Sequence, residues 1–171
     1  MKPRLLLSND DGITSPFLPP FAKALSQVAD VEVVVPASEQ SWIGRAYSRH
    51  SELLVKEVEK FGVACRTVSG TPSDCVNIAL AHLCKTPPDV VVSGLNIGQN
   101  TAYPLLWSSG TFAAAAEAAG WGFPAFAFSM RLEKRFYEQC RLRHVIDSLE
   151  LEKSLEAASE HAAEFVIKML A

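Results

Sequence analysis

Near its amino terminus the chain reads RLLLSNDDG at residues 4–12, an apolar run that passes abruptly into polar residues. A strand buried on both faces of a parallel sheet reads as such a continuous hydrophobic run. Because side chains alternate along a strand, Asp10 and Asp11 converge only if the backbone turns, and Gly12 permits that turn. Two close carboxylates repel each other, and a bound cation removes the repulsion. The stretch therefore predicts a cation site at the tip of a buried strand, with a solvated Asn-Asp-Asp-Gly turn as the alternative.

The composition indicates a single globular domain in a reducing compartment. The chain has 171 residues, of which 49% are hydrophobic and 20% charged, and a net charge of −3. Its length suffices for a substantial core, and its charge argues against a generally basic nucleic-acid surface. We expect one α/β domain over residues 1–171, in the cytoplasm, with no signal peptide, membrane-spanning segment or disulfide framework. Four cysteines outside any C-x-x-C pair are expected to be small buried hydrophobes: Cys65, Cys75, Cys84 and Cys140.

Segments of strand type and helix type alternate along the chain, which indicates right-handed βαβ units and an α/β fold. The expected strands are residues 4–8, 31–36, 51–58, 63–68, 89–93 and 124–129, the third and fourth forming a hairpin or an extension at the edge of the sheet. The expected helices are residues 16–29, 72–86, 112–119 and 151–170. The apolar face expected for the last helix comprises Leu155, Ala158, Ala162, Phe165, Val166, Met169 and Leu170. Three histidines are expected at the surface: His82, His144 and His161.

Two further strand ends carry polar residues that would meet Asp10 at the same edge of the sheet. The loop after the second strand offers several serine hydroxyls, Ser41 among them, although a plain surface loop is the alternative. Trp42 in this loop favours packing on a substrate ring or on a neighbouring element. The strand at 89–93 leads into Asn96, whose amide oxygen is a hard ligand suited to Mg²⁺ or Mn²⁺.

The segment Ser108-Ser109-Gly110-Thr111 opens an alanine-rich helix. A helix amino terminus presents unpaired N–H groups and a partial positive charge, which suits a phosphate group. The alternative is ordinary N-capping by Ser109 or Thr111, and both interpretations can hold at once.

Five motifs, in the same order, resemble those of the SurE family, the survival-protein phosphatases that act as 5′/3′-nucleotidases. The motifs lie at residues 8–12, 39–41, 69–76, 88–98 and 109–111, and the resemblance extends from residue 5 to residue 129. It implies a Rossmann-like, three-layer α/β/α fold with a mostly parallel sheet. It also implies metal-dependent hydrolysis of phosphomonoesters, chiefly nucleoside 5′- or 3′-monophosphates.

Carried over by position, the resemblance implies one divalent cation, Mg²⁺ or Mn²⁺, held by Asp10, Asp11, Ser41 and Asn96. The phosphate-binding residues that it implies are Asn9, Asn100, Ser108, Ser109, Gly110 and Thr111. The catalytic residues that the resemblance implies are Asp10, Asp11 and Asn9. No histidine is placed as a general acid, and the sequence does not assign which of the two aspartates would orient the water. The expected partners are a nucleotide or other phosphomonoester and a second copy of the chain, with no nucleic-acid polymer and no membrane.

The sequence also differs from the family pattern. Family members continue past the position of Ala171 with a further strand and an arm that exchanges between subunits, so we expect a domain that is short at its carboxyl end. A remnant that binds nucleotide or metal without turnover is the alternative. A receiver-like signalling domain would need an acid at the end of the strand at 89–93, but Asp89 stands at its beginning. A dinucleotide-binding dehydrogenase would need G-x-G-x-x-G after the first strand, which is absent.

Overall fold

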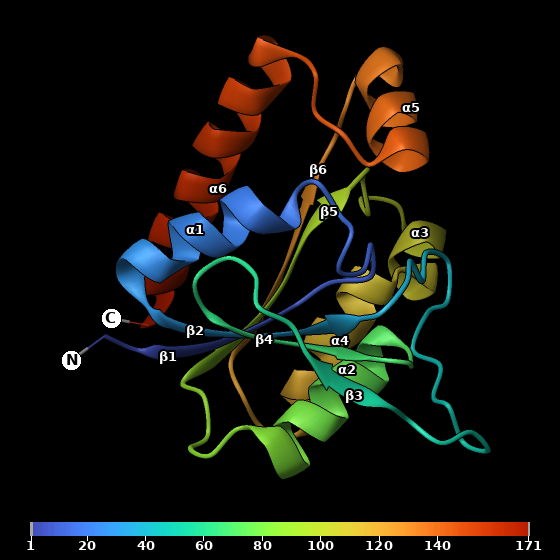
Figure 1. Cartoon of the computed structure of the whole chain (residues 1–171), viewed down its shortest axis with the longest axis vertical. Coiled ribbons are helices and arrows are strands. Elements are labelled where there is room, and N and C mark those ends of the chain that lie inside the picture. Colours follow the sequence, from blue (N-terminus) through green and yellow to red (C-terminus); the bar gives the residue numbers. More distant parts are fainter. Residues whose placement is uncertain (1, 171) are drawn as a thin grey trace.

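The sheet of this protein has six strands, in the order β3-β4-β2-β1-β5-β6 (Figure 1). The computed structural model describes residues 2–170, apart from the side chains of residues 141–143, so the two terminal residues of the expected 1–171 domain lie outside the described residues. The strands are β1 (Arg4–Ser8), β2 (Asp30–Pro36), β3 (Val55–Glu57), β4 (Ala64–Val68), β5 (Val90–Ile97) and β6 (Ala125–Met130). The helices are α1 (Leu18–Val28), α2 (Pro72–Ile78), the π-helical turn η1 (Ala79–Leu83), α3 (Tyr103–Ser108), α4 (Gly110–Gly120), α5 (Lys134–Arg143) and α6 (Leu149–Leu170). All neighbouring strands are parallel except the antiparallel pair β3–β4, which confirms the expected mostly parallel sheet and the expected hairpin.

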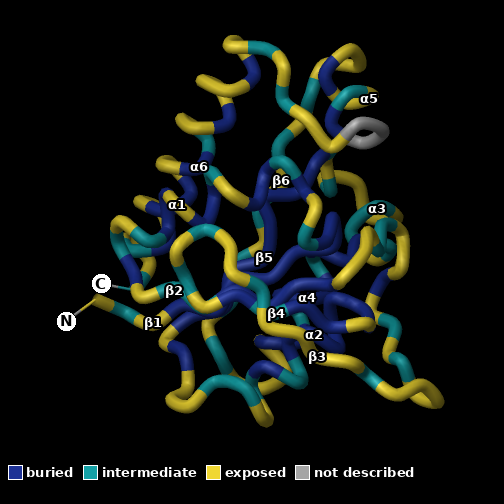
Figure 2. Tube along the Cα trace, in the orientation of Figure 1, coloured by how far each residue is buried: buried dark blue, intermediate teal, exposed yellow. Residues whose placement is uncertain are grey.

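Helices cover both faces of the sheet, which makes three layers (Figure 1). On one face, α1 and α6 pack in the same core as Leu5 and Leu7 of β1. On the other face, α2 and α4 pack with Leu6. Because alternate residues of β1 face opposite helical layers, every position of this strand after Arg4 is buried. Figure 2 shows the same burial along the central strands, and the predicted α/β/α fold is confirmed.

The order of the strands reverses at β1. Strand β2 lies on one side of β1 and β5 on the other, with Ser8 of β1 opposite Ser93 of β5. In open α/β sheets, ligands bind outside the carboxyl ends of the strands at such a reversal. The residues that follow Ser8 therefore lie where this fold type places its binding sites.

Strand β5 is longer than the sequence predicts. The expected strand ends at Ser93, but β5 continues to Ile97, and all of its residues are buried. A register shift against β6 between Ser93 and Asn96 accommodates the extra length. The expected exit segment at 94–101 is therefore wrong over residues 94–97, and Asn96 belongs to the strand itself.

The first helix begins later than predicted. Helix α1 starts at Leu18 and not at residue 16, with Pro19 and Pro20 in its first turn. Proline is tolerated there because the first N–H groups of a helix have no intrahelical acceptor.

Three other segments differ from expectation. Strand β3 comprises only Val55–Glu57 of the expected 51–58, and as an edge strand it is exposed throughout. The helix expected over 72–86 divides into α2 and η1. Helix α3 was not predicted, because none of its residues is buried and it has no apolar periodicity.

Two expectations about burial also need correction. Cysteines 65, 75 and 140 are buried and form no disulfide, but Cys84 is only half-buried because it follows η1 at the rim of a surface hollow. In α6, Leu155 and Val166 are buried, whereas Phe165 and Met169 remain 45% and 57% exposed. The three histidines are exposed, as predicted. Among the described residues, no helix has the length and apolar character needed to cross a bilayer.

Candidate functional site

The turn after β1 is buried and held by its own side chains. Asp10 and Asp11 are each 3% exposed. Asn9 closes the turn, since its Nδ2 donates to the Gly12 carbonyl oxygen and its Oδ1 accepts from the Gly12 N–H, both at 3.1 Å. Gly12 has a φ of 77°, which glycine adopts without strain. The solvated turn considered as an alternative is therefore wrong, and the side chain of Asn9 has a structural partner in Gly12.

The two carboxylates of the turn reach different elements. Oδ1 of Asp10 accepts a hydrogen bond of 2.6 Å from the Thr111 hydroxyl, at the start of α4. Oδ2 of Asp11 accepts from the backbone N–H of Ile97, at the end of β5, at 3.0 Å. The turn thus connects β1 to the two elements that carry the other predicted site residues.

Asp10 is a buried acid that has no basic partner among the described residues. Burial raises the pKa of Asp10 above its usual value, and the nearby Glu39 carboxylate raises it further, while hydrogen bonds from Thr111 oppose both effects. None of the ion pairs among the described residues includes Asp10. A bound cation would compensate the buried charge, because opposite charge nearby favours the ionised carboxylate.

Asp10 lines a cavity of about 310 Å³ at the carboxyl edge of the sheet. The predicted site residues that line it are Asp10, Ser41, Asn96, Asn100, Ser108 and Ser109. The predicted residues that do not line it are Asn9, Asp11, Gly110 and Thr111, which contact the β1 turn, β5 or Asp10. The structure therefore gathers the predicted residues around one cavity, and their individual roles stay predictions.

The amino terminus of α4 packs closely against Asp10. A Cβ atom added to Gly110 would lie 2.7 Å from Cβ of Asp10 and 3.0 Å from Cγ of Pro72, so only glycine allows this approach. Ser109 is the N-cap of α4, and its Oγ accepts from the Phe112 N–H at 3.1 Å. Capping by Ser109 is thereby confirmed, whereas capping by Thr111 is wrong, because the Thr111 hydroxyl donates to Asp10 instead.

The loop after β2 brings Ser41 to the cavity. The Gln40 N–H donates to the carbonyl oxygen of Asp10 at 2.7 Å, and the Ser41 N–H donates to Oε1 of Glu39 at 2.9 Å. Trp42, which also lines the cavity, has a φ of 63° and is 69% exposed. Asn100, which also lines the cavity, donates from its Nδ2 to the Ser129 hydroxyl at 3.0 Å.

Part of the cavity wall consists of residues that no sequence motif predicted. Arg131, Leu132 and Tyr137 line the cavity, and Arg131 is the one cation among its described lining residues. Arg131 follows directly after β6, so the rule that sites form at the carboxyl ends of parallel strands could have identified it. Tyr137 lies on α5, and no local motif indicates its place in the cavity.

The donor atoms at the cavity suit a hard divalent cation. Within the described part of the chain, no group of three or more His, Cys, Asp and Glu side chains could hold a metal ion. Asp10, Ser41 and Asn96 instead offer carboxylate, hydroxyl and amide oxygens. Oxygen ligands of this kind suit Mg²⁺ or Mn²⁺, and Mg²⁺ commonly keeps several waters and uses only one or two carboxylates. The residues present therefore fit the predicted cation.

The position of Asp89 counts against a receiver-like domain. Its Oδ2 accepts from the backbone N–H of Arg4 at 2.8 Å, at the amino ends of β1 and β5. Asp89 therefore lies at the opposite end of the strands from Asp10.

The fold and the cavity together define a Rossmann-like α/β protein with an oxygen-lined site at the switch point of its sheet. The family model described as "Survival protein SurE" matches residues 5–170, and the chain belongs to that family.

The relatives support this assignment. The 5′-nucleotidase SurE of Methanoculleus marisnigri is 47% identical over 133 residues, which are 78% of this chain and 50% of that protein. The 5′-nucleotidase SurE of Methanopyrus kandleri is 44% identical over 129 residues, 75% of this chain and 49% of that protein. The crystal structure of the SurE protein from Aquifex aeolicus superimposes with a TM-score of 0.77 at 28% identity and covers 98% of this chain and 60% of that one. The chain spans about half the length of the curated relatives that it matches.

Proposed function

We propose that this chain carries a divalent-metal-dependent phosphomonoesterase site that hydrolyses nucleoside 5′- or 3′-monophosphates to nucleoside and phosphate. The observation that carries the proposal is the buried Asp10 carboxylate, which lines an oxygen-rich cavity beside the start of α4 and has no ion-pair partner among the described residues. The relatives named 5′-nucleotidase SurE support the substrate class.

Asp10, Asp11, Ser41 and Asn96 would hold the cation. When bound, such an ion supplies Lewis-acid polarisation of a phosphoryl oxygen and eases the ionisation of water. The Thr111 hydroxyl, at 2.6 Å from Oδ1 of Asp10, fixes one carboxylate oxygen. That contact fixes the orientation of Asp10 before a ligand binds. Preorganised groups lower the activation free energy, because they need not reorient during the reaction.

The start of α4 and Arg131 would bind the phosphate group. Ser108 and Ser109 line the cavity where α4 begins, and a helix amino terminus favours an anion through its N–H groups and dipole. Arg131 supplies a positive charge from the wall formed after β6. Charge that spreads over the phosphoryl oxygens in the transition state would thus meet donors on two sides.

Two aromatic residues would receive the nucleoside. Trp42 and Tyr137 both line the cavity, and they come from the loop after β2 and from α5. Aromatic faces with exposed edges suit stacking on a nucleobase, and such stacking tolerates different bases. We therefore expect a preference for nucleotides over small phosphate esters but a broad base specificity.

The test is phosphate release from a panel of nucleoside monophosphates by the 171-residue chain, with Mg²⁺ or Mn²⁺ and then with a chelator. We expect release that requires the metal, disappears on chelation and exceeds release from a phosphate ester without a base. A folded chain, shown by circular dichroism, that releases no phosphate from any substrate would overturn the proposal. Nucleotide binding without release would favour the remnant interpretation.

A further inference from the structure

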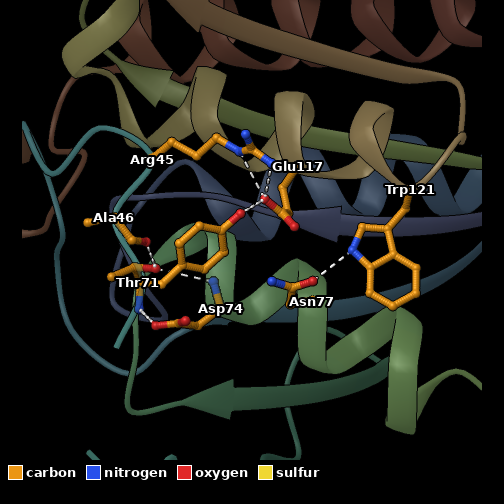
Figure 3. Close-up of polar contacts among 8 residues, drawn as sticks. Arg45, Ala46, Thr71, Asp74, Asn77, Glu117 and Trp121 are labelled. Carbon is orange, nitrogen blue, oxygen red and sulfur yellow. Dashed lines mark hydrogen bonds and ion pairs between the residues drawn. The ribbon is translucent and has the colours of Figure 1, made fainter. Parts of the chain in front are cut away.

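Glu117 is a buried acid on α4 that the proposed chemistry does not use (Figure 3). The residue is only 4% exposed. Its Oε2 accepts from Nε of Arg45 at 2.9 Å and pairs with Nη2 of Arg45 at 2.8 Å. The Tyr47 hydroxyl donates to the same oxygen. A buried carboxylate is costly unless it is paired and hydrogen-bonded, so Arg45 and Tyr47 together make this one tolerable.

Arg45 and Tyr47 belong to the loop that carries Ser41 and Trp42 into the cavity. Before Ser41, the Gln40 N–H donates to the Asp10 carbonyl oxygen at 2.7 Å. After Trp42, the main chain of the loop is held by hydrogen bonds from the Gly44 N–H to the Ser108 carbonyl oxygen (2.9 Å), from the Thr71 hydroxyl to the Ala46 carbonyl oxygen (2.7 Å) and from the Ser48 N–H to Oδ2 of Asp74 (3.2 Å). Each residue from 44 to 48 is therefore held against α2, α4 or the end of α3. Within this set, Glu117 is the acceptor for both side chains that the loop sends toward α4.

The loop also has an unusual backbone over residues 42–44. Trp42 has a φ of 63° and Gly44 a φ of 58°. A bulky residue with positive φ is costly and persists only where the surrounding structure holds it in place. Ser41 and Trp42, which lie between the main-chain anchors at Gln40 and Gly44, would therefore shift if the side-chain anchors at Arg45 and Tyr47 were lost.

We propose that Glu117 is a positioning residue: through Arg45 and Tyr47 it fixes the loop that places Ser41 at the cation site and Trp42 on the cavity wall. The contacts of Glu117 support its role in positioning the loop, and the expected effect on cation and nucleotide binding rests on the proposed function. Glu117 does not line the cavity and acts only through the loop. It is the residue that links the middle of α4 to the geometry of the site at its start.

The test uses Glu117→Gln, which keeps the shape of the side chain and removes its charge, and Tyr47→Phe, which removes one donor from a half-exposed residue. Hydrogen–deuterium exchange of the peptide covering residues 41–48 reports the loop directly. We expect faster exchange in both variants, with the larger change in Glu117→Gln. The dissociation constant for Mn²⁺ should rise about 10-fold in Glu117→Gln, the size of effect found when partners of metal ligands are removed. The KM for the nucleotide should rise more than kcat falls at saturating Mn²⁺.

The matched control is Trp121→Phe. Nε1 of Trp121 donates to Oδ1 of Asn77 at 2.7 Å, which joins α4 to α2 without touching the loop (Figure 3). This variant should lose some thermal stability but keep wild-type exchange over residues 41–48, wild-type Mn²⁺ affinity and wild-type KM.

The inference is overturned if Glu117→Gln and Tyr47→Phe melt earlier but exchange residues 41–48 and bind Mn²⁺ as the wild type does. Glu117 would then only stabilise the fold, through its ion pair with Arg45. Absence of phosphate release from the wild-type chain would count against the proposed function alone. The exchange measurement, which needs neither substrate nor metal, would still decide whether Glu117 positions the loop.

Discussion

The two ends of the central strands carry two hollows of opposite character. The hollow at the amino ends has a volume of about 620 Å³, twice the 310 Å³ of the cavity at the carboxyl ends. Of the two acids that line it, Glu32 pairs with Arg66 and Asp30 is exposed to solvent. Asp89, at the same ends of the strands, lies 3.3 Å from the Arg4 guanidinium. At the carboxyl ends, Asp10 is buried and has no ion-pair partner among the described residues.

The comparison shows that the balance of charge marks the site better than size does. The backbone N–H and the guanidinium of Arg4 lower the pKa of the exposed Asp89 carboxyl, whereas burial raises the pKa of Asp10. A paired surface acid needs no ligand, because its charge is already compensated and solvated. Functional sites often contain a buried acid of this kind, whose ionised form is disfavoured.

The largest effect is expected when the same chemical change, carboxylate to amide, is made at each end of the central strands in turn. Asp10→Asn replaces a carboxylate by an amide at the carboxyl ends, and we expect metal-dependent phosphate release to fall at least about 100-fold, the cost of losing a key electrostatic group. The circular dichroism spectrum should not change, because an amide oxygen can still accept from Thr111. Glu32→Gln makes the matching change at the amino ends and should leave the rate unaltered. Wild-type turnover in Asp10→Asn would break the comparison.

The second prediction concerns the close approach of α4 to Asp10. Gly110→Ala should destabilise the protein by about 1–3 kcal/mol, because the added methyl group overpacks the contact with Asp10 and Pro72. Gly120→Ala, at the other end of the same helix, meets only the end of the Arg45 side chain at 3.5 Å. It should stabilise the protein by about 0.4–1 kcal/mol, because alanine restricts the unfolded chain more than glycine does. Urea midpoints measure both effects, and equal shifts of the same sign would contradict the packing argument.

The third prediction compares one arginine from each hollow, Arg131 and Arg4. Arg131→Ala should raise the KM for a nucleoside monophosphate about 10-fold, since one charge-assisted hydrogen bond to a phosphate is worth about 1.5–3 kcal/mol. Arg4→Ala removes a cation from the amino-end hollow and should leave KM unchanged. Steady-state kinetics at saturating Mn²⁺ would measure both. A KM that rises equally in both variants would point to general electrostatic attraction and not to a phosphate contact.

The smallest expected effect is on how the free energy of unfolding depends on pH when no metal is present. The folded-state pKa of Asp10 is raised, so the folded state binds this proton more tightly and the free energy of unfolding falls as pH rises through that range. Asp10→Asn should therefore gain stability relative to the wild type as pH rises from below the unfolded pKa of aspartate through the raised folded-state pKa of Asp10. The folded-state pKa of Asp89 is lowered, so its contribution is present above its unfolded pKa and is lost as pH falls through the folded value. Asp89→Asn should accordingly be less stable than the wild type at neutral pH and equal to it in acid. Thermal melts with a chelator present measure the two differences, and trends of the same sign would contradict the assignment.

The sequence predicts the parts of the site that local pattern encodes. The leucine run of β1 predicts a buried strand, and the polar residues after it predict a turn, because period and turn chemistry depend on neighbours in the chain. The N-cap at Ser109 is likewise a local signal.

What the sequence does not predict depends on distant contacts. The extension of β5 to Ile97 depends on its register against β6, and the place of Tyr137 in the cavity depends on how α5 packs. The pairing of Glu117 with Arg45 joins residues that are far apart in the chain. No periodicity or spacing encodes such contacts, so only the folded structure identifies them.

The central claim is that the carboxyl ends of β1 and β5 form a divalent-cation site, and direct Mn²⁺ binding tests it. Titration followed by electron paramagnetic resonance would compare the wild-type chain with Asp10→Asn and Glu32→Gln. We predict one bound Mn²⁺ per wild-type chain and per Glu32→Gln chain, and weakened or absent binding in Asp10→Asn. Wild-type affinity in Asp10→Asn, or no binding by the folded wild-type chain, would contradict the account.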